Sequence, residues 1–355
     1  MRILYVITGL NLGGAEKVVC NLADEMNKKG HEVKIVYLKG KVEVQPQSDK
    51  IELINLGLYS PLSFLKAISH YKAIVRNFRP DVIHAHMIHA NIFARLNQLY
   101  TGKNFLICSA HNSNEGGLLR MMAYKSTNFL SSLNTNVSQE ASQALINKGA
   151  FTQANLVTIY NGIDLNRFNS KHFVKSSSEK KICLSVGRLN IQKDYFNLLT
   201  AISLLDSQLL EKIEFYIAGE GELRAEIEQQ IHALKLQDKV KLLGMRSDIP
   251  DLLNRADYFI LSSKHEGLPT VLIEAMACQC FVIATDCGGS SEIMGDTGIL
   301  VPKQDSILLS HALNKAFNLD EKFILENNIN ARNRVEEKFS LENSVNTWLD
   351  LYENC

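Results

Sequence analysis

Two glutamates, Glu266 and Glu274, lie eight positions apart in the segment HEGLPTVLIEAMACQC (265–280). The run DYFILSS before them predicts a buried strand, and Pro269 is typical of the first turn of a helix formed by TVLIEAMACQ. Glu266 then falls in the loop at the carboxyl end of the strand, and Glu274 falls on the second turn of the helix. The two carboxylates are therefore expected on either side of a helix N-terminus.

That helix N-terminus would favour an anion, because its first backbone N–H groups have no intrahelical partner and the helix dipole adds positive charge. A diphosphate could dock there, but a carboxylate on each side would repel it. The glutamates are therefore predicted to accept hydrogen bonds from hydroxyl groups at the two ends of the diphosphate. A nucleotide sugar has that layout. The alternative is one capping and one surface glutamate, which is the common outcome for an isolated pair.

Two cations follow another predicted strand in SVGRLNIQKDYF: Arg188 and, five positions later, Lys193. Arg suits a diphosphate through its bidentate fork, and Lys does so as a point charge. The same residues could instead belong to a solvated helix start. The first strand ends in TGLNLGGAEK, where Gly13 and Gly14 would let the backbone approach a ligand closely.

Several other classes of site find little support. The dinucleotide fingerprint G-x-G-x-x-G is missing, and Lys39 ends the second strand where an NAD site needs an acid. No aromatic residues alternate with a basic stripe, which disfavours nucleic acid. The histidines of HAHMIHA (84–90) have no carboxylate or cysteine beside them, and Cys278 with Cys280 lacks a second Cys or His pair. No metal site is predicted.

The elements that position these residues alternate between short β-branched runs and helical patterns in both halves of the 355-residue chain. This pattern predicts an α/β protein with parallel sheets covered by helices on both faces. Helices are expected at 15–29 and 63–78, among others. Strands are expected at RILYVITG, EVKIVYL, DVIHAH, FLICSAH and TNVSQ, and then at KICLSVGRL, IEFYIAGEG, KVKLLG, DYFILSS, FVIATD and GILV.

The length predicts two domains, and a charged, serine-rich stretch at 170–181 marks the boundary. We expect two Rossmann-like domains at 1–165 and 182–338, joined by a linker at 166–181. Ligands of such folds bind at the carboxyl ends of the strands, so the cleft between the domains is the expected site.

Charge and hydropathy bear on localisation. Residues 1–165 carry 17 Lys and Arg against 11 Asp and Glu, and 166–355 carry 21 against 27. The segment 62–79 has an apolar and a basic side, so it either lies on a membrane surface or covers the sheet, and 116–130 is a second apolar and basic stretch. The start of the chain does not have the pattern of a secretory signal, no apolar run would span a bilayer, and the seven cysteines form no CxxC pair. We expect a cytoplasmic protein, and the alternative is that its N-terminal domain contacts the inner face of the cytoplasmic membrane.

Seven short sequence motifs, distributed along the whole chain, together form a recognisable pattern. The chain resembles the retaining glycosyltransferases of family 4 (glycosyl transferases group 1), which have the two-domain GT-B fold. The resemblance runs from end to end and would make the first domain acceptor-binding and the second nucleotide-sugar-binding. It also implies that a C-terminal helix, 339–355, crosses back to the N-terminal domain. The segments are GGAEK (13–17), SAHNS (109–113), YNGID (160–164), GRLNIQK (187–193), AGEGELR (218–224), HEGLPTVLIEAMA (265–277) and DCGGSSEIM (286–294).

The resemblance also implies roles for individual residues. Glu266 would contact the transferred sugar as a catalytic residue, and Glu274 would bind the ribose. His111 matches the catalytic histidine of the N-terminal domain, although on its own it could be a hydrogen-bonding core residue. The other expected substrate-binding residues are Arg188, Lys193, Gly267, Leu268 and Pro269 at the diphosphate, Gly13 and Gly14 at the phosphate or acceptor, His86 at the acceptor, Met245 and Arg246 beside the base, and Asn112, next to His111.

The expected chemistry follows from the same resemblance. The family transfers a sugar with retention of configuration and without a metal or other cofactor, and the D-x-D motif of metal-dependent sugar transferases is missing here. No pair of acids suits a covalent route, so front-side attack is the hypothesis. The donor is expected to be a nucleotide sugar, with uridine favoured, carrying a hexose or N-acetylhexosamine. The acceptor would be a hydroxyl of a glycan or lipid-linked molecule in lipopolysaccharide, capsule or other surface polysaccharide synthesis. The alternatives are a nucleotide-sugar 2-epimerase of the same fold and a non-catalytic nucleotide-sugar-binding protein.

Overall fold

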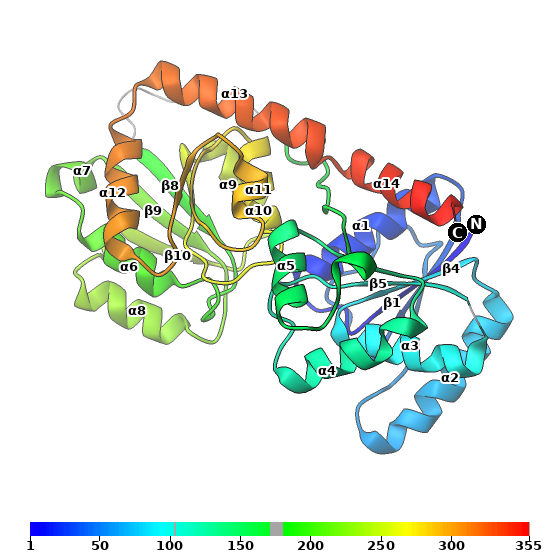
Figure 1. Cartoon of the computed structure of the whole chain (residues 1–355). Coiled ribbons are helices and arrows are strands. Elements are labelled where there is room, and N and C mark those ends of the chain that lie inside the picture. Colours follow the sequence, from blue (N-terminus) through cyan, green and yellow to red (C-terminus); the bar gives the residue numbers. More distant parts are fainter. Residues whose placement is uncertain (103, 171–179, 355) are drawn as a thin grey trace. The chain divides into compact units, whose positions relative to one another are not determined.

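The computed structural model describes residues 1–102, 104–170 and 180–354 (Figure 1). The chain divides into two compact α/β units. The N-terminal unit comprises Met1–Gly162 together with the chain from Leu341 onward, and the C-terminal unit comprises Ile163–Ser340.

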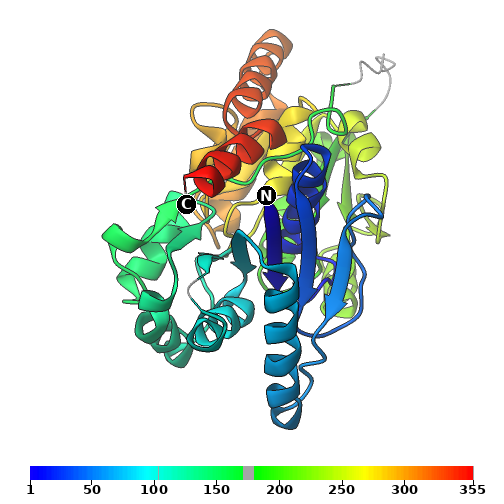
Figure 2. The ribbon, with the colours of Figure 1, turned by 90° about the vertical axis from the view of Figure 1, so that its right-hand side faces the viewer.

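The N-terminal unit is built on a seven-stranded parallel sheet with the order β3-β2-β1-β4-β5-β6-β7. Figure 2 shows β1 and β2, the two darkest blue arrows, side by side and pointing the same way. The chain leaves β1 towards β2 on one side and later returns to β4 on the other, so β1 and β4 flank a topological switch point. The strands are β1 (Arg2–Ile7), β2 (Glu32–Tyr37), β3 (Glu52–Asn55), β4 (Val82–His86), β5 (Phe105–Ser109), β6 (Leu133–Asn136) and β7 (Val157–Thr158).

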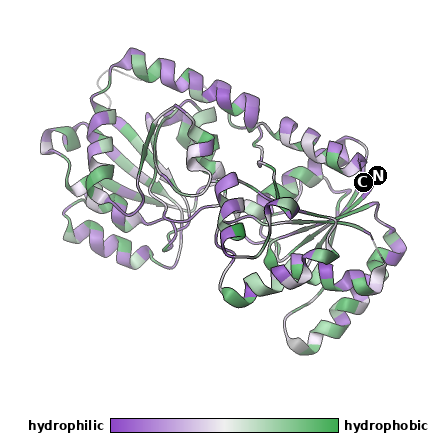
Figure 3. Ribbon diagram, viewed as in Figure 1, coloured by the Kyte–Doolittle hydropathy of each residue, from purple (hydrophilic) through white to green (hydrophobic). Residues whose placement is uncertain are grey.

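Helices cover both faces of this sheet because the side chains of each strand alternate between the faces. Ile3, Tyr5 and Ile7 of β1 pack in one cluster with helices α1 and α14, whereas Leu4 and Val6 pack in the other with α2 and α3. The strands are accordingly coloured mostly as hydrophobic in Figure 3. The helices are α1 (Gly14–Lys28), α2 (Phe64–Phe78), α3 (Ile88–Thr101), α4 (Leu118–Thr127), α5 (Gln139–Asn147) and α14 (Leu341–Glu353).

The C-terminal unit repeats this plan with a six-stranded parallel sheet of order β10-β9-β8-β11-β12-β13. Its switch point lies between β8 and β11. The strands are β8 (Lys181–Val186), β9 (Ile213–Ala218), β10 (Val240–Gly244), β11 (Tyr258–Leu261), β12 (Phe281–Thr285) and β13 (Ile299–Val301). The helices are α6 (Tyr195–Ser203), α7 (Ser207–Glu211), α8 (Arg224–Ala233), α9 (Ile249–Arg255), α10 (Thr270–Ala277), α11 (Ser290–Met294), α12 (Ser306–Phe317) and α13 (Glu321–Lys338).

The observed boundaries differ from the expected ones where distant segments pair. The N-terminal unit ends at Gly162 rather than at 165, because Ile163 pairs with Ser340 and donates its N–H to the Phe339 carbonyl at 2.9 Å within the C-terminal unit. The C-terminal helix correspondingly begins at Leu341 rather than at 339. Of the linker expected at 166–181, residues 166–170 and 180–181 group with the C-terminal unit, and 171–179 lie outside the described residues.

Most of the amphipathic segment expected at 62–79 forms helix α2 (Phe64–Phe78). Its residues Ala67, Tyr71, Ile74, Val75 and Phe78 are buried against the sheet, so most of the helix covers the core. The apolar residues before and at the start of the helix stay exposed. Across the described chain, no helix combines the length and apolar character that crossing a membrane requires.

Candidate active site

An ion pair lies at the switch point of the C-terminal sheet. Lys193, in the loop after β8, donates from Nζ to Glu266 Oε1 at 2.6 Å, and Glu266 lies in the loop after β11. The two side chains are only 18% and 15% exposed. The structure thus brings together the predicted diphosphate cation and the predicted sugar-binding carboxylate, which are 73 positions apart in sequence.

Three further hydrogen bonds hold this pair. Ser263 donates its hydroxyl to the same Glu266 oxygen at 2.7 Å. Ser262 donates its hydroxyl to the Lys193 carbonyl at 2.8 Å, and the Lys264 N–H bonds the Gln192 carbonyl at 2.9 Å. The loops after β8 and β11 are therefore tied to each other by backbone as well as side chains. Ser263 was not predicted as a site residue, since a serine at a strand end is common in any sheet.

Gly288 fixes the position of the Glu266 backbone. It has a φ of +57°, and a Cβ at this position would lie 2.7–2.8 Å from Glu266 O, C and Cβ. Next to it, the Gly289 N–H donates to the Gly267 carbonyl at 2.8 Å. The backbone of the DCGG segment after β12 therefore packs directly against the loop that carries Glu266, and only glycine fits at position 288.

The N-terminus of α10, where the sequence predicts that an anion binds, lies next to the Glu266 loop. The helix begins at Thr270, and Pro269 is its N-cap rather than a residue of its first turn, because its φ and ψ of −71° and 89° are not helical. A proline side chain has no acceptor, so the N-cap residue makes no side-chain hydrogen bond to the first N–H groups of the helix. Gly267, Leu268 and Pro269 are buried beside this end, and Glu274 is half-buried on the second turn.

The remaining predicted residues of this unit lie at the same edge of the sheet but are solvent-exposed. Arg188 follows β8 and pairs with Glu222 at 3.2 Å, with side chains 66% and 55% exposed. Arg246 follows β10 and makes two bonds to Asp248, at 2.8 and 2.6 Å. Met245 is also exposed. An anion that binds to Arg188 must therefore replace Glu222 as the partner of its guanidinium group.

In the N-terminal unit a row of histidines runs from β4, at the switch point, to the loop after the neighbouring strand β5. His86 ends β4, and His111 follows β5 by two residues. His86 Nδ1 lies 3.0 Å from His111 Nε2, and the His84 ring packs on the His86 ring with centroids 3.9 Å apart. His86 is 1% exposed, so the structure does not expose it for the direct contact with an acceptor that the sequence led us to expect. Its hydrogen bond is with His111.

The row is anchored by a buried hydrogen-bond network that sequence reasoning missed. His84 Nδ1 lies 2.6 Å from the Tyr352 hydroxyl of α14, and its Nε2 lies 2.7 Å from the Ser109 hydroxyl. Tyr352 is 3.3 Å from the Tyr5 hydroxyl, and Ser109 is 2.7 Å from that of Thr135. Helix α14 thereby reaches the strands that carry His86 and His111.

Burial keeps these histidines neutral. It lowers the pKa of His111 to about 4 and holds the pKa of His84 and of His86 well below the usual value. The neighbouring histidines lower the pKa of His84 and His86 further, since each would repel a second positive charge. Near pH 7 the row therefore offers neutral donors and acceptors rather than cations.

The loop that carries His111 is held by Glu115. Its carboxylate accepts the His111 N–H at 3.1 Å and also bonds the backbone of Ile88 and Asn112. Burial raises the pKa of Glu115, and these N–H bonds oppose that rise. Asn112 in turn accepts the Asn114 N–H through its side chain at 3.1 Å. The predicted substrate ligand Asn112 therefore has a role in the loop itself.

The glycines after β1 form the start of α1. Gly13 is the N-cap residue, and a Cβ there would lie 2.3 Å from Glu16 Oε2, whereas a Cβ at Gly14 would meet nothing within 4 Å. Burial raises the pKa of Glu16. Gly13 thus makes room for this carboxylate, and Gly14 leaves the surface open at the position that the sequence assigns to a ligand.

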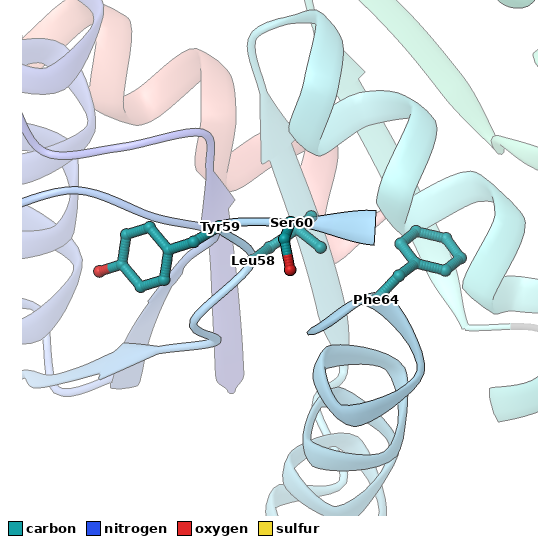
Figure 4. A pocket seen from close by; sticks show the side chains of 4 residues that line it. All are labelled: Leu58, Tyr59, Ser60 and Phe64. Atoms are coloured by element: carbon teal, nitrogen blue, oxygen red, sulfur yellow. The ribbon is translucent and has the colours of Figure 1, made fainter. Parts of the chain in front are cut away.

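A separate pocket of about 420 Å³ lies at the start of α2 (Figure 4). Leu58, Tyr59, Ser60 and Phe64 line it, and none of them was predicted as a site residue. The Phe64 ring packs edge-on against Phe93 of α3, with centroids 6.3 Å apart. The pocket is therefore part of the apolar region around the beginning of α2.

Two family models match the chain. The model described as Glycosyltransferase Family 4 matches residues 12–167, and the model described as Glycosyl transferases group 1 matches residues 166–335. The curated relatives include two proteins of Campylobacter jejuni. One is an α-1,4-N-acetyl-D-galactosaminyltransferase, named for a GalNAc- and diNAcBac-containing PP-undecaprenol, which is 30% identical over 91% of this chain and 90% of its own.

The second Campylobacter relative is an N-acetylgalactosaminyltransferase named for a diphospho-undecaprenol, and it is 28% identical over 83% of this chain and 84% of its own. Among solved structures, Anabaena HepE in complex with UDP superposes with a TM-score of 0.83 at 20% identity, covering all of both chains. At that identity the superposition bears on the fold alone. The two parallel-sheet units, the family models and the 30% identical relative agree, and the chain belongs to the group 1, family 4 glycosyltransferases with the GT-B fold.

Proposed function

We propose that this glycosyltransferase moves a hexose or N-acetylhexosamine from a UDP-sugar to a hydroxyl of a lipid-linked or other glycan acceptor, with retention and without a metal. The observation that carries the proposal is the Lys193–Glu266 pair beside the N-terminus of α10, whose N-cap residue, Pro269, makes no side-chain cap bond. A cation, a helix N-terminus and a hydroxyl-binding carboxylate are the groups that a diphosphate-linked sugar requires.

In this proposal the diphosphate binds at the N–H groups of α10 and draws Lys193 and Arg188 away from their carboxylate partners. Glu266, freed from Lys193, accepts a hydrogen bond from a hydroxyl of the transferred sugar. Glu274 on the second turn binds the ribose. Uridine is the proposed base, supported by a fold shared with a protein that was solved with UDP and with UDP-glucose.

The proposed reaction places the charge on the leaving diphosphate. As the bond from the anomeric carbon to the phosphate oxygen breaks, Lys193, Arg188 and the α10 dipole stabilise the developing negative charge. The acceptor oxygen attacks from the same face, and its proton passes to the leaving phosphate. His111, neutral near pH 7, hydrogen-bonds the substrate at the reacting centre.

The proposed acceptor is a polyprenyl-diphosphate-linked glycan of a surface polysaccharide, because both Campylobacter relatives are named for such molecules. We also propose that the N-terminal unit contacts the membrane that holds the lipid. Leu62 and Leu65 at the start of α2 are 94% and 77% exposed, and Leu119 at the start of α4 is 82% exposed. Lys66 and Arg120 adjoin them, and apolar plus basic side chains suit an anionic surface.

The transfer assay combines the protein with UDP-GalNAc, UDP-GlcNAc or UDP-glucose and a polyprenyl-diphosphate-linked N-acetylhexosamine, with a chelator present. We expect an α-linked product from an α-linked donor, identified by NMR of the anomeric proton. An epimerised sugar formed without acceptor would favour the epimerase, and donor binding without any turnover would favour the binding protein.

The membrane contact has its own test. Flotation with vesicles that contain anionic lipid compares the wild type with a Leu62→Ser, Leu65→Ser variant and with Leu325→Ser, whose leucine is exposed in the C-terminal unit. We expect the double variant alone to lose binding. Equal binding of all three would contradict the contact.

A further inference from the structure

The bond between His86 and His111 limits where their hydrogens lie. His86 Nδ1 and His111 Nε2 are 3.0 Å apart, and both rings are neutral near pH 7, so one ring donates and the other accepts. Each neutral ring carries one N–H. The tautomer of His86 therefore determines the tautomer of His111.

The second nitrogen of His86 indicates the direction of this bond. His86 Nε2 is buried and has no hydrogen-bond partner in the part of the chain that the structure describes. A hydrogen on Nε2 would be a buried donor without an acceptor, which is the rarer and costlier arrangement. A hydrogen on Nδ1 instead is used in the bond to His111 and leaves only a lone pair unpaired.

We propose that His86 is a positioning residue whose Nδ1–H donates to His111 Nε2 and thereby holds His111 as the tautomer that carries its hydrogen on Nδ1. This rests on the proposed function, in which His111 contacts the substrate. His111 then presents a hydrogen-bond donor to the sugar or acceptor and is not the base that takes the acceptor proton. That agrees with a reaction in which the leaving phosphate takes it.

The surroundings hold His86 in the required orientation. The His84 ring lies against it at 3.9 Å between centroids, and His84 is itself fixed from both sides by Tyr352 and Ser109. The Tyr5 ring lies 5.8 Å away on the neighbouring strand. A His86 ring packed in this way has little freedom to turn, so its Nδ1 stays directed at His111.

The first test is spectroscopic and needs no substrate. NMR of the 15N-histidine-labelled protein at pH 7.5 distinguishes a nitrogen that bears hydrogen from one that does not. We expect His111 to bear hydrogen on Nδ1 and His86 to bear it on Nδ1. A wild-type spectrum in which His111 bears hydrogen on Nε2 would overturn the proposal, whether or not any sugar is transferred.

Two variants test what the bond does for the reaction. His86→Leu fills much of the same space without a donor, whereas His86→Asn places an amide N–H near the position of Nδ1. We expect His86→Leu to lower kcat by about 10- to 100-fold, with the KM for the donor changed less than about threefold. His86→Asn should recover most of that loss and keep the His111 tautomer. Equal losses in both variants, with unchanged His84 signals, would mean that His86 is only a packing residue.

If no sugar is transferred by the wild type with any donor or acceptor, the proposed function fails. The spectrum still decides the tautomer in that case. If His86→Leu does not fold, the wild-type and His86→Asn spectra remain sufficient.

Discussion

Replacing Glu266 with alanine should change nucleotide binding and turnover in opposite directions. In the structure Glu266 shares one of its oxygens between Lys193 and Ser263. A bound diphosphate must attract Lys193 away from that oxygen. Without the carboxylate, Lys193 is available to the diphosphate from the start, while the transferred sugar loses its acceptor group.

The magnitude follows from the geometry of the pair. Its atoms are 2.6 Å apart and its side chains are 18% and 15% exposed, so we place it at the upper end of the range for surface pairs, about 1 kcal/mol. Removing that competition predicts about fivefold tighter UDP binding, since 1.4 kcal/mol corresponds to tenfold. The lost hydrogen bond between a charged carboxylate and a sugar hydroxyl amounts to about 1.5–3 kcal/mol, which lowers kcat by about 10- to 100-fold.

Calorimetric titration with UDP and a steady-state assay of UDP release measure the two effects. Glu222→Ala is the matched control, because Glu222 pairs with Arg188 but is 55% exposed. It should change UDP affinity by less than about twofold. If Glu266→Ala binds UDP tenfold more weakly and turns over normally, Glu266 supports the nucleotide and not the sugar, and our assignment of roles is refuted.

Three further predictions concern the residues around the site. Gly288→Ala should lower kcat by about tenfold or more and reduce thermal stability, because its φ of +57° costs an L-residue about 1–2 kcal/mol and its Cβ displaces Glu266, and wild-type kinetics would refute this. Tyr352→Phe should lower the urea midpoint, because the buried His84 Nδ1 loses its partner at a cost of about 1–3 kcal/mol, and an unchanged midpoint would show that the bond is not needed. Stability should fall as the pH drops from about 6.5 towards 4, because the unfolded chain takes up protons in that window that native His111, with a pKa of about 4, does not. Urea midpoints at several pH values should show a shallower decline for His111→Gln, and an identical decline would contradict the lowered pKa.

Much of the fold follows from the sequence because the alternation of short apolar runs with helical patterns is a local property of the chain. RILYVI is a short continuous apolar run, which is typical of a parallel strand buried on both faces, and TVLIEAMA is an apolar helical stretch. Strand β1 and helix α10 form at those segments. The positions of Arg188, Lys193 and Glu266 after strand ends, and of Glu274 on α10, follow in the same way. What carries them to one edge is the parallel order of the sheet, which the alternating pattern predicts.

The contacts that sequence reasoning missed are between distant residues with ordinary local surroundings. His84 and Tyr352 are 268 positions apart, and neither the strand around His84 nor the helix around Tyr352 signals a hydrogen bond. Glu115 looks like a surface acid in a glycine-rich loop, yet it holds His111. The pairing of Ile163 with Ser340 likewise moved both expected domain boundaries, because two strands or loops can pair without any mark in their composition.

The central claim is that Lys193, Arg188 and the N-terminus of α10 form a nucleoside-diphosphate site. Calorimetric titration of the wild type with UDP, GDP, ADP and NAD, in a chelator and then in magnesium, tests it most directly, with Lys193→Met as the comparison. We predict that UDP binds with or without magnesium and that Lys193→Met weakens this binding by about tenfold. Binding of NAD alone, binding only when magnesium is added, or UDP binding unaffected by Lys193→Met would contradict it.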